Sequence, residues 1–123
     1  MNKVILIGRL TKDPDIRATQ TGTSVTSFTL AVDRHYKNAD GERIADFIRC
    51  IAWSKLADIV GKYLHKGDMA AAFGTLQARS FENKDGLKQV VYEVVCEEIK
   101  MIGSKRENNS FNGEALNLDD MPF

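Results

Sequence analysis

The stretch Asp46–Trp53, DFIRCIAW, constrains the fold more than any other part of the chain. β-branched and aromatic residues dominate it and no Pro or Gly interrupts it, so it is predicted to be a β-strand. Side chains alternate between the two faces of a strand. One face of this strand therefore carries Phe47, Arg49, Ile51 and Trp53. The other face is small and apolar after its first residue, as a core-facing surface should be.

Two large rings with a guanidinium between them are unusual on a strand face that meets solvent. Such a surface can stack planar nucleic-acid bases while its cation neutralises the phosphates that join them. The alternative is that Phe47 and Trp53 pack in a second core or in a contact between subunits. The strand by itself leaves both interpretations open.

Length and charge bound the class of protein. The chain has 123 residues, enough for about one domain with a modest core. Its formal net charge is zero, which argues against a simple polycation. Residues 1–103 hold 15 Lys and Arg against 13 Asp and Glu, whereas residues 104–123 hold 2 against 4. No apolar run approaches a membrane span and the N-terminus lacks the pattern of a signal peptide, so we expect a cytoplasmic protein without membrane contact.

The two cysteines, Cys50 and Cys96, fall on apolar faces of predicted strands, where a reduced thiol behaves as a small hydrophobic group. We therefore expect no disulfide. The only histidines are His35 and His65, and no paired spacing of metal ligands is present. Neither a metal site nor a cofactor is expected.

Alternation and turn signals predict the first half of the chain and the helix that follows it. Val4 to Leu10 is expected to be a continuously buried strand, with Gly8 at a bend or a close backbone approach. Residues 24–34 form a second strand that leads into a polar hairpin loop at residues 36–43. At Ser54 the apolar period changes from two to about 3.6, which predicts a short helix with Ser54 as its N-cap and Gly67 as its stop.

Residues 68–81 are ambiguous, because the Met69-Ala70-Ala71-Ala72 run favours a helix while Gly67-Asp68 and Gly74 favour a new strand. We interpret them as a strand, which places Gln77, Arg79 and Phe81 on one face as a second basic and aromatic surface. After a turn at residues 83–86, residues 89–102 form the last strand. Strands interrupted by one helix between the third and fourth are typical of an all-β, five-stranded oligonucleotide-binding barrel (OB-fold).

The chain resembles the bacterial-type single-stranded DNA-binding proteins. The resemblance rests on Asn2 to Leu10, Asp13-Pro14, Phe28 with Leu30-Ala31-Val32, Asp46 to Trp53, Lys66-Gly67 and Glu93-Val94-Val95. It runs from Asn2 to about Ile102 and resumes in the last five residues. Matches dispersed in this order are far more specific than any single motif.

The resemblance implies a homotetramer of OB-fold barrels that binds and protects single-stranded DNA, irrespective of sequence, during replication, recombination and repair. It places base-stacking roles on Phe47, Trp53, Phe81 and, at the foot of the hairpin loop, Tyr36. It places phosphate contacts first on Arg49 and Arg79, which lie beside these rings. Further phosphate contacts would come from Lys3, Arg9, Lys12, Arg34, Lys55 and Lys62.

The resemblance also divides the chain into a DNA-binding domain at residues 1–103, a flexible linker at 104–118 and an acidic tip at 119–123. The tip consists of Asp119, Asp120, Met121, Pro122 and Phe123. Such a tip docks on replication, recombination and repair enzymes, the ring being buried while the carboxylates meet basic residues. The alternative is a disordered tail that binds nothing. The linker is short for the family.

Two rival functions remain at the sequence level. An enzyme is disfavoured, because the carboxylates are scattered and form no catalytic constellation. A protein-interaction module is the stronger rival, in which the three aromatic residues would bind a partner. Housekeeping, DNA-uptake and phage-encoded proteins would all share these features. Ala70–Ala72 and Phe73 depart from the family pattern. The alanine run suggests a thinner core or subunit contact, and Phe73 could add to an interface, add to the DNA surface or be a tolerated exposed ring.

Overall fold

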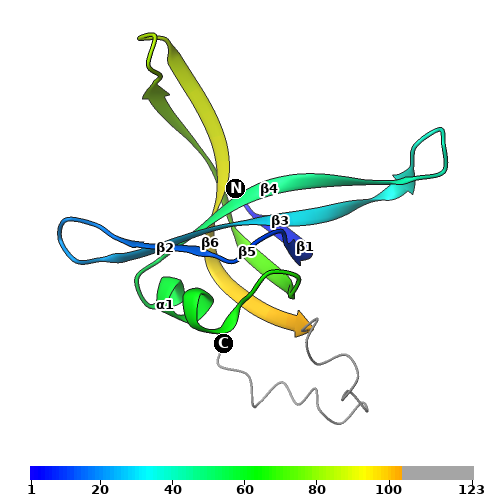
Figure 1. The fold of residues 1–123 in the computed structure, drawn as a ribbon, viewed down its shortest axis with the longest axis horizontal. Coiled ribbons are helices and arrows are strands. Elements are labelled where there is room, and N and C mark those ends of the chain that lie inside the picture. Colours follow the sequence, from blue (N-terminus) through cyan, green and yellow to red (C-terminus); the bar gives the residue numbers. More distant parts are fainter. Residues whose placement is uncertain (104–123) are drawn as a thin grey trace.

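Six strands and one helix make up the part of the chain, residues 1–103, that the computed structural model describes (Figure 1). They follow in the order β1 (Val4–Leu10), β2 (Asp15–Ala18), β3 (Ser24–Lys37), β4 (Arg43–Trp53), α1 (Ser54–Tyr63), β5 (Met69–Glu82) and β6 (Lys88–Gly103). The strand interpretation of the alanine-rich segment is therefore confirmed. The predicted linker and tip lie outside the described residues.

Five of the strands close into a barrel. Hydrogen-bonded neighbours run in the order β1, β5, β6, β4, β3, and β1 also pairs with β3, which completes the ring. All these pairings are antiparallel except that of β4 with β6. β2 pairs only with β3 and lies outside the ring. Because α1 falls between the third and fourth barrel strands, the predicted OB-fold is confirmed.

The core fills the barrel with apolar side chains from every barrel strand. It includes Leu10, Phe28, Leu30, Cys50, Ala52, Ala70, Ala72, Val94 and Ile99. α1 covers the end of the barrel opposite the β5–β6 hairpin tip (Figure 1), with Ala57 and Val60 buried. The side chain of buried Thr26 donates a 3.0 Å hydrogen bond to the Ala57 carbonyl. This bond fixes the helix against β3.

The two cysteines are free thiols in this core, as the sequence predicts. They lie on the neighbouring strands β4 and β6, where Cys50 is in register with Val94. A hydrogen bond with Cys96, together with burial, raises the pKa of the Cys50 thiol. The Cys50 side chain therefore serves as a small apolar group at neutral pH. The same hydrogen bond lowers the pKa of the Cys96 thiol.

Two glycines permit strands to approach closely. A Cβ added at Gly8 of β1 would collide with the Ala31 carbonyl, and one at Gly74 of β5 would collide with the Val95 carbonyl. Only a residue without a side chain fits such an approach of backbones. The predicted close approach at Gly8 is confirmed.

Some details of the prediction are wrong. α1 ends at Tyr63 with Leu64 as its C-cap, before the predicted stop at Gly67. The first strand is not continuously buried, because its Ile5 and Ile7 side chains are more than half exposed in the single chain. β1 has only one face towards the barrel interior, so its apolar residues alternate. Ser54 is not an N-cap: it is the first helical residue, with φ 58°, and Trp53 precedes it in extended conformation without a side-chain capping bond. β4 runs into α1 with no loop between them.

Three hairpins extend from the barrel (Figure 1), and two of them share a turn design. In the β3–β4 turn, Asn38 Oδ1 accepts hydrogen bonds from the N–H groups of Asp40 and Glu42. In the β5–β6 turn, Asn83 Oδ1 accepts from Asp85 and Leu87 in the same way. Gly41 and Gly86 adopt positive φ at equivalent positions, a conformation that glycine adopts without steric cost. The one helix in the described residues is not long and apolar enough to span a membrane.

Candidate nucleic-acid interface

β4 presents the first of the two predicted surfaces. Phe47 is 69% exposed and Trp53 is 46% exposed, and the Arg49 side chain between them is about half exposed. The opposite face is buried at Cys50 and Ala52, so the predicted alternation is confirmed for these residues. Ile51 is the exception. It is buried because β3 and β6 flank β4 on both sides at this point.

β5 presents the second surface. Gln77, Arg79 and Phe81 are all exposed beyond the point where this strand leaves the barrel. The Arg79 guanidinium carbon lies 5.8 Å from the centroid of the Phe81 ring. A cation at this distance from a ring is attracted by its π-electrons. Phe73, which has the same strand parity, is half-buried.

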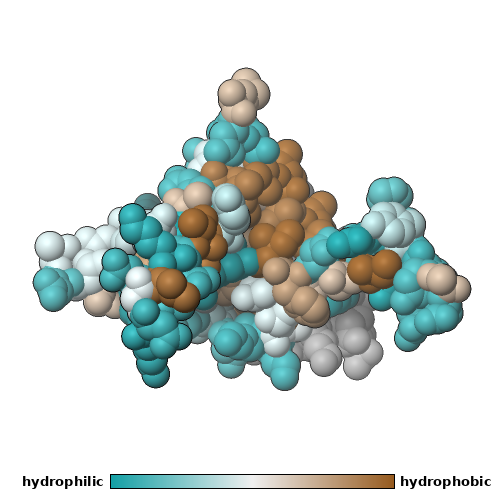
Figure 2. All heavy atoms as spheres, turned by 90° about the horizontal axis from the view of Figure 1, so that it is seen from above, coloured by the Kyte–Doolittle hydropathy of each residue, from teal (hydrophilic) through white to brown (hydrophobic). Residues whose placement is uncertain are grey.

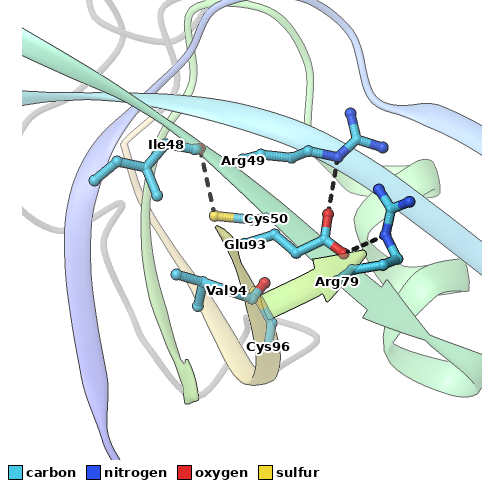
Figure 3. A network of polar contacts seen from close by, with 7 residues as sticks. All are labelled: Ile48, Arg49, Cys50, Arg79, Glu93, Val94 and Cys96. Atoms are coloured by element: carbon cyan, nitrogen blue, oxygen red, sulfur yellow. Dashed lines mark hydrogen bonds and ion pairs between the residues drawn. The ribbon is translucent and has the colours of Figure 1, made fainter. Parts of the chain in front are cut away.

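A buried carboxylate joins the two surfaces. Glu93 of β6 is only 4% exposed. Its Oε2 accepts a hydrogen bond from Arg49 Nε and its Oε1 accepts one from Arg79 Nε, both at 3.1 Å (Figure 3). Since β6 lies between β5 and β4 in the sheet, the basic residues of the two surfaces meet at this residue. Glu93 was not among the predicted site residues, although an acidic residue inside the run Val90–Cys96 was a signal.

The foot of the β3–β4 hairpin holds a second polar cluster. Arg34 donates from Nε and Nη2 to both carboxylate oxygens of Asp46, at 3.0 and 2.9 Å, and from Nη1 to the Tyr36 hydroxyl at 2.8 Å. The hydrogen bond from Arg34 holds the pKa of Asp46 below its usual value, and the same bond raises the pKa of Arg34. Tyr36 is about half exposed. All three guanidinium nitrogens of Arg34 thus donate to protein partners, and the bond to the hydroxyl orients the Tyr36 ring.

The remaining predicted cations are spread over other elements. Lys3 forms a 2.9 Å ion pair with Glu97, and Arg9 Nη1 donates to the Gly67 carbonyl. Lys62 lies 5.3 Å from the centroid of the neighbouring Tyr63 ring. Lys12 and Lys55 are exposed, one after β1 and the other in the first turn of α1. Glu93 therefore joins Arg49 and Arg79, and Phe81 lies beside Arg79. The other predicted cations lie outside this cluster.

Comparison with known proteins agrees with this fold and surface. The Single-strand binding protein family matches residues 1–102. Single-stranded DNA-binding protein 1 of Staphylococcus aureus is 46% identical over 119 residues, which cover 90% of this chain and 71% of the relative. Single-stranded DNA-binding protein 2 of Listeria monocytogenes is 48% identical, covering 95% and 72%. The Bacillus cereus single-stranded DNA-binding protein is 48% identical, covering 91% and 68%. The chain belongs to the Single-strand binding protein family.

Proposed function

We propose that this chain binds single-stranded DNA through the surface formed by β4 and β5, with bases stacked on Phe47, Trp53 and Phe81 and phosphates beside Arg49 and Arg79. The arrangement of these five side chains supports the roles assigned to them. Large exposed rings flank two guanidinium groups that one buried carboxylate holds together. Membership of the family supports single-stranded DNA as the ligand.

The mechanism is stoichiometric binding rather than catalysis. Each base stacked on an aromatic ring contributes about 1–3 kcal/mol, and every base has a face that can stack. The arginines release counterions from the phosphates, which makes the affinity depend on salt. Sequence preference is therefore weak. Duplex DNA binds poorly because its bases already stack on one another. Coating of this kind protects single strands during replication, recombination and repair in the cytoplasm.

The outlying residues extend the same path. Lys3, Arg9, Lys12, Lys55 and Lys62 add phosphate contacts on neighbouring elements. Tyr36 adds a further stacking ring on the β3–β4 hairpin, and Arg34 supports it through the hydrogen bond to its hydroxyl. The charge of Arg34 is offset by Asp46, so its own attraction for phosphate is weaker than that of Arg49 or Arg79.

The exposed apolar residues support self-association as a homotetramer. Ile5 and Ile7 lie on β1, and Ile5 is in register with Phe73 of β5. Val4 to Gly8 pair with β5 on one side only, so the other edge of β1 is open to a further strand. Figure 2 shows hydrophobic side chains gathered in a broad patch on the face turned towards the viewer. A second copy would cover such a surface.

The proposed function assigns a separate role to each of three segments of the chain. Residues 1–103 are the DNA-binding domain, residues 104–118 a linker and residues 119–123 a tip that docks on replication, recombination and repair proteins. The acidic residues Asp119 and Asp120 beside Phe123 support docking, since a buried ring with flanking ion pairs is a common anchor. A peptide of residues 115–123 should bind a purified recombination helicase, and Phe123→Ala should abolish that binding.

The chain's single tryptophan tests the DNA proposal. Trp53 fluorescence is titrated with an oligo-dT strand and with a duplex of equal length, at low and at high salt. We expect strong quenching by the single strand, weakened by salt, and little by the duplex. Equal quenching by the duplex would contradict single-strand selectivity. No quenching by either would assign the aromatic surface to a protein contact.

A further inference from the structure

Glu93 occupies an unusual place for an acidic residue. Its side chain is 5% exposed and lies on the middle one of three neighbouring strands, in register with Gln77 of β5. A carboxylate in such a place is costly unless charged partners satisfy it. Both of its oxygens are satisfied, one by Arg49 and one by Arg79. The negative charge also lies on the surface where the chain would attract DNA phosphates.

The two arginines contact Glu93 in the same way. Each donates from Nε, the nitrogen nearest the aliphatic stem, and neither Nη1 nor Nη2 of either residue has a hydrogen-bond partner within residues 1–103. Both side chains are about half exposed. Figure 3 shows the terminal nitrogens of both arginines directed away from the carboxylate. A guanidinium held in this manner keeps its outer edge for a phosphate, which it can bind through two parallel hydrogen bonds.

Holding the stem has a consequence for affinity. A free arginine side chain loses rotamer freedom when it binds a phosphate, which weakens association. The contact with Glu93 restricts both side chains before DNA arrives. It also keeps Arg79 beside the Phe81 ring. One unit of positive charge remains on the three groups together.

We propose that Glu93 is a positioning residue of the DNA-binding surface: it orders Arg49 and Arg79 through their Nε atoms so that their Nη groups meet successive phosphates. The proposal rests on the proposed binding of single-stranded DNA by this surface. It assigns to an acidic residue a favourable effect on the binding of a polyanion.

Glu93→Gln tests this proposal through the sign of its effect. Glutamine has nearly the same shape, but one of the two acceptor oxygens becomes an NH2 group. That group cannot accept from the arginine on its side. If only net charge mattered, removal of a negative charge would tighten DNA binding. If Glu93 positions the arginines, oligo-dT binding should weaken by about fivefold to tenfold, the usual effect of ordering rotamer-rich side chains. Anisotropy of labelled oligo-dT at low salt measures the affinity.

Glu98→Gln is the matched control. Glu98 lies on the same strand, is exposed and pairs with Lys100 at 3.7 Å, so the substitution removes the same charge without touching the arginines. We expect its affinity to stay within about twofold of the unchanged chain. A gain in affinity in both variants would show that net charge decides and would overturn the proposal.

A double-mutant cycle distinguishes positioning of the arginines by Glu93 from a purely structural role of this residue. In an Arg49→Ala, Arg79→Ala background, Glu93→Gln should have no further effect on oligo-dT affinity, because the groups through which it acts are gone. The Nε–H protons of the two arginines, followed by NMR, should exchange with solvent more slowly in the unchanged chain than in Glu93→Gln. An equal loss of affinity in both backgrounds would contradict positioning.

Two further outcomes need controls: the variant could fail to fold, and the unchanged chain could fail to bind oligo-dT. If Glu93→Gln unfolds, as circular dichroism would show, Glu93→Asp replaces it, since the shorter carboxylate keeps the charge but cannot reach both Nε atoms. Weaker binding by the folded Glu93→Asp variant supports positioning, and unchanged binding overturns it. If the unchanged chain itself fails to bind oligo-dT, the proposed function and the role of Glu93 fail together. If it binds and Glu93→Gln binds equally well, only the role of Glu93 fails.

Discussion

At the scale of single residues, Trp53 is the most informative side chain, because it is a large ring half exposed at the end of β4. Trp53→Ala should weaken oligo-dT binding by roughly fivefold to 100-fold, the loss of one stacked base. Trp53→Phe should lose much less. Anisotropy of labelled DNA measures both. Tyr92→Ala is the control, since it removes an exposed ring from β6 at a position of opposite parity to Glu93. Equal effects at both positions would rule out a specific stack.

Asp46 gives a prediction about pH. Its pKa is lowered in the folded state by the hydrogen bond from Arg34, so the carboxylate stabilises the fold above the pKa of the unfolded chain. That contribution is lost as pH falls through the lowered folded pKa. The pair is exposed, so the effect is small. Unfolding midpoints of the unchanged chain and Asp46→Asn should differ slightly at pH 7 and converge at acid pH. A difference that grew on acidification would contradict this sign.

The outward direction of Phe47, Arg49, Trp53 and Phe81 was predictable because alternation along a strand is a local property. Ile51 was not, since its burial depends on strands that flank it on both sides. The Glu93 contacts reach across 44 and 14 positions of the chain. Contacts of that kind depend on strand register, which composition and periodicity do not contain.

At the scale of elements, the pairing of β5 with β6 depends on Gly74. A Cβ at this position would meet the Val95 carbonyl, so Gly74→Ala must push the strands apart. We expect the free energy of unfolding to fall by about 1–3 kcal/mol, as in other overpacked sites. Chemical denaturation measures it. Gly103→Ala is the control, because among residues 1–103 no atom apart from its chain neighbours lies within 4 Å of its added Cβ. Similar losses in the two variants would exclude the close approach as the cause.

The elements themselves were largely predictable, and the exceptions have physical reasons. The alanine run in β5 forms a strand although its propensity favours helix, because two neighbouring strands satisfy its backbone. Ser54 has the residue type of an N-cap, yet the strand that precedes it enters the helix directly. The irregular register between Phe73 and Gly74 leaves no mark in the sequence pattern.

At the scale of the whole molecule, the open edge and exposed face of β1 predict how copies associate. Ile7→Glu places a charge on this face, where the unchanged chain exposes an apolar side chain. We expect the mass measured by light scattering to fall below that of a tetramer while circular dichroism stays unchanged. Leu87→Glu, at an exposed turn position, should leave the mass unchanged. A tetramer that survives Ile7→Glu would place the interface elsewhere.

The ring of strands also sets when the surface becomes complete. β6 is the last element of the barrel, and its pairing with both β5 and β4 closes the ring. Glu93 belongs to that strand, so Arg49 and Arg79 stay unconnected until it joins. Pairings between distant parts of a chain form slowly, because loop-closure entropy opposes them. During synthesis on the ribosome, a chain that has not yet released β6 therefore has neither a closed barrel nor an ordered pair of arginines. Ordering of the two arginines and completion of the fold therefore arise in one step.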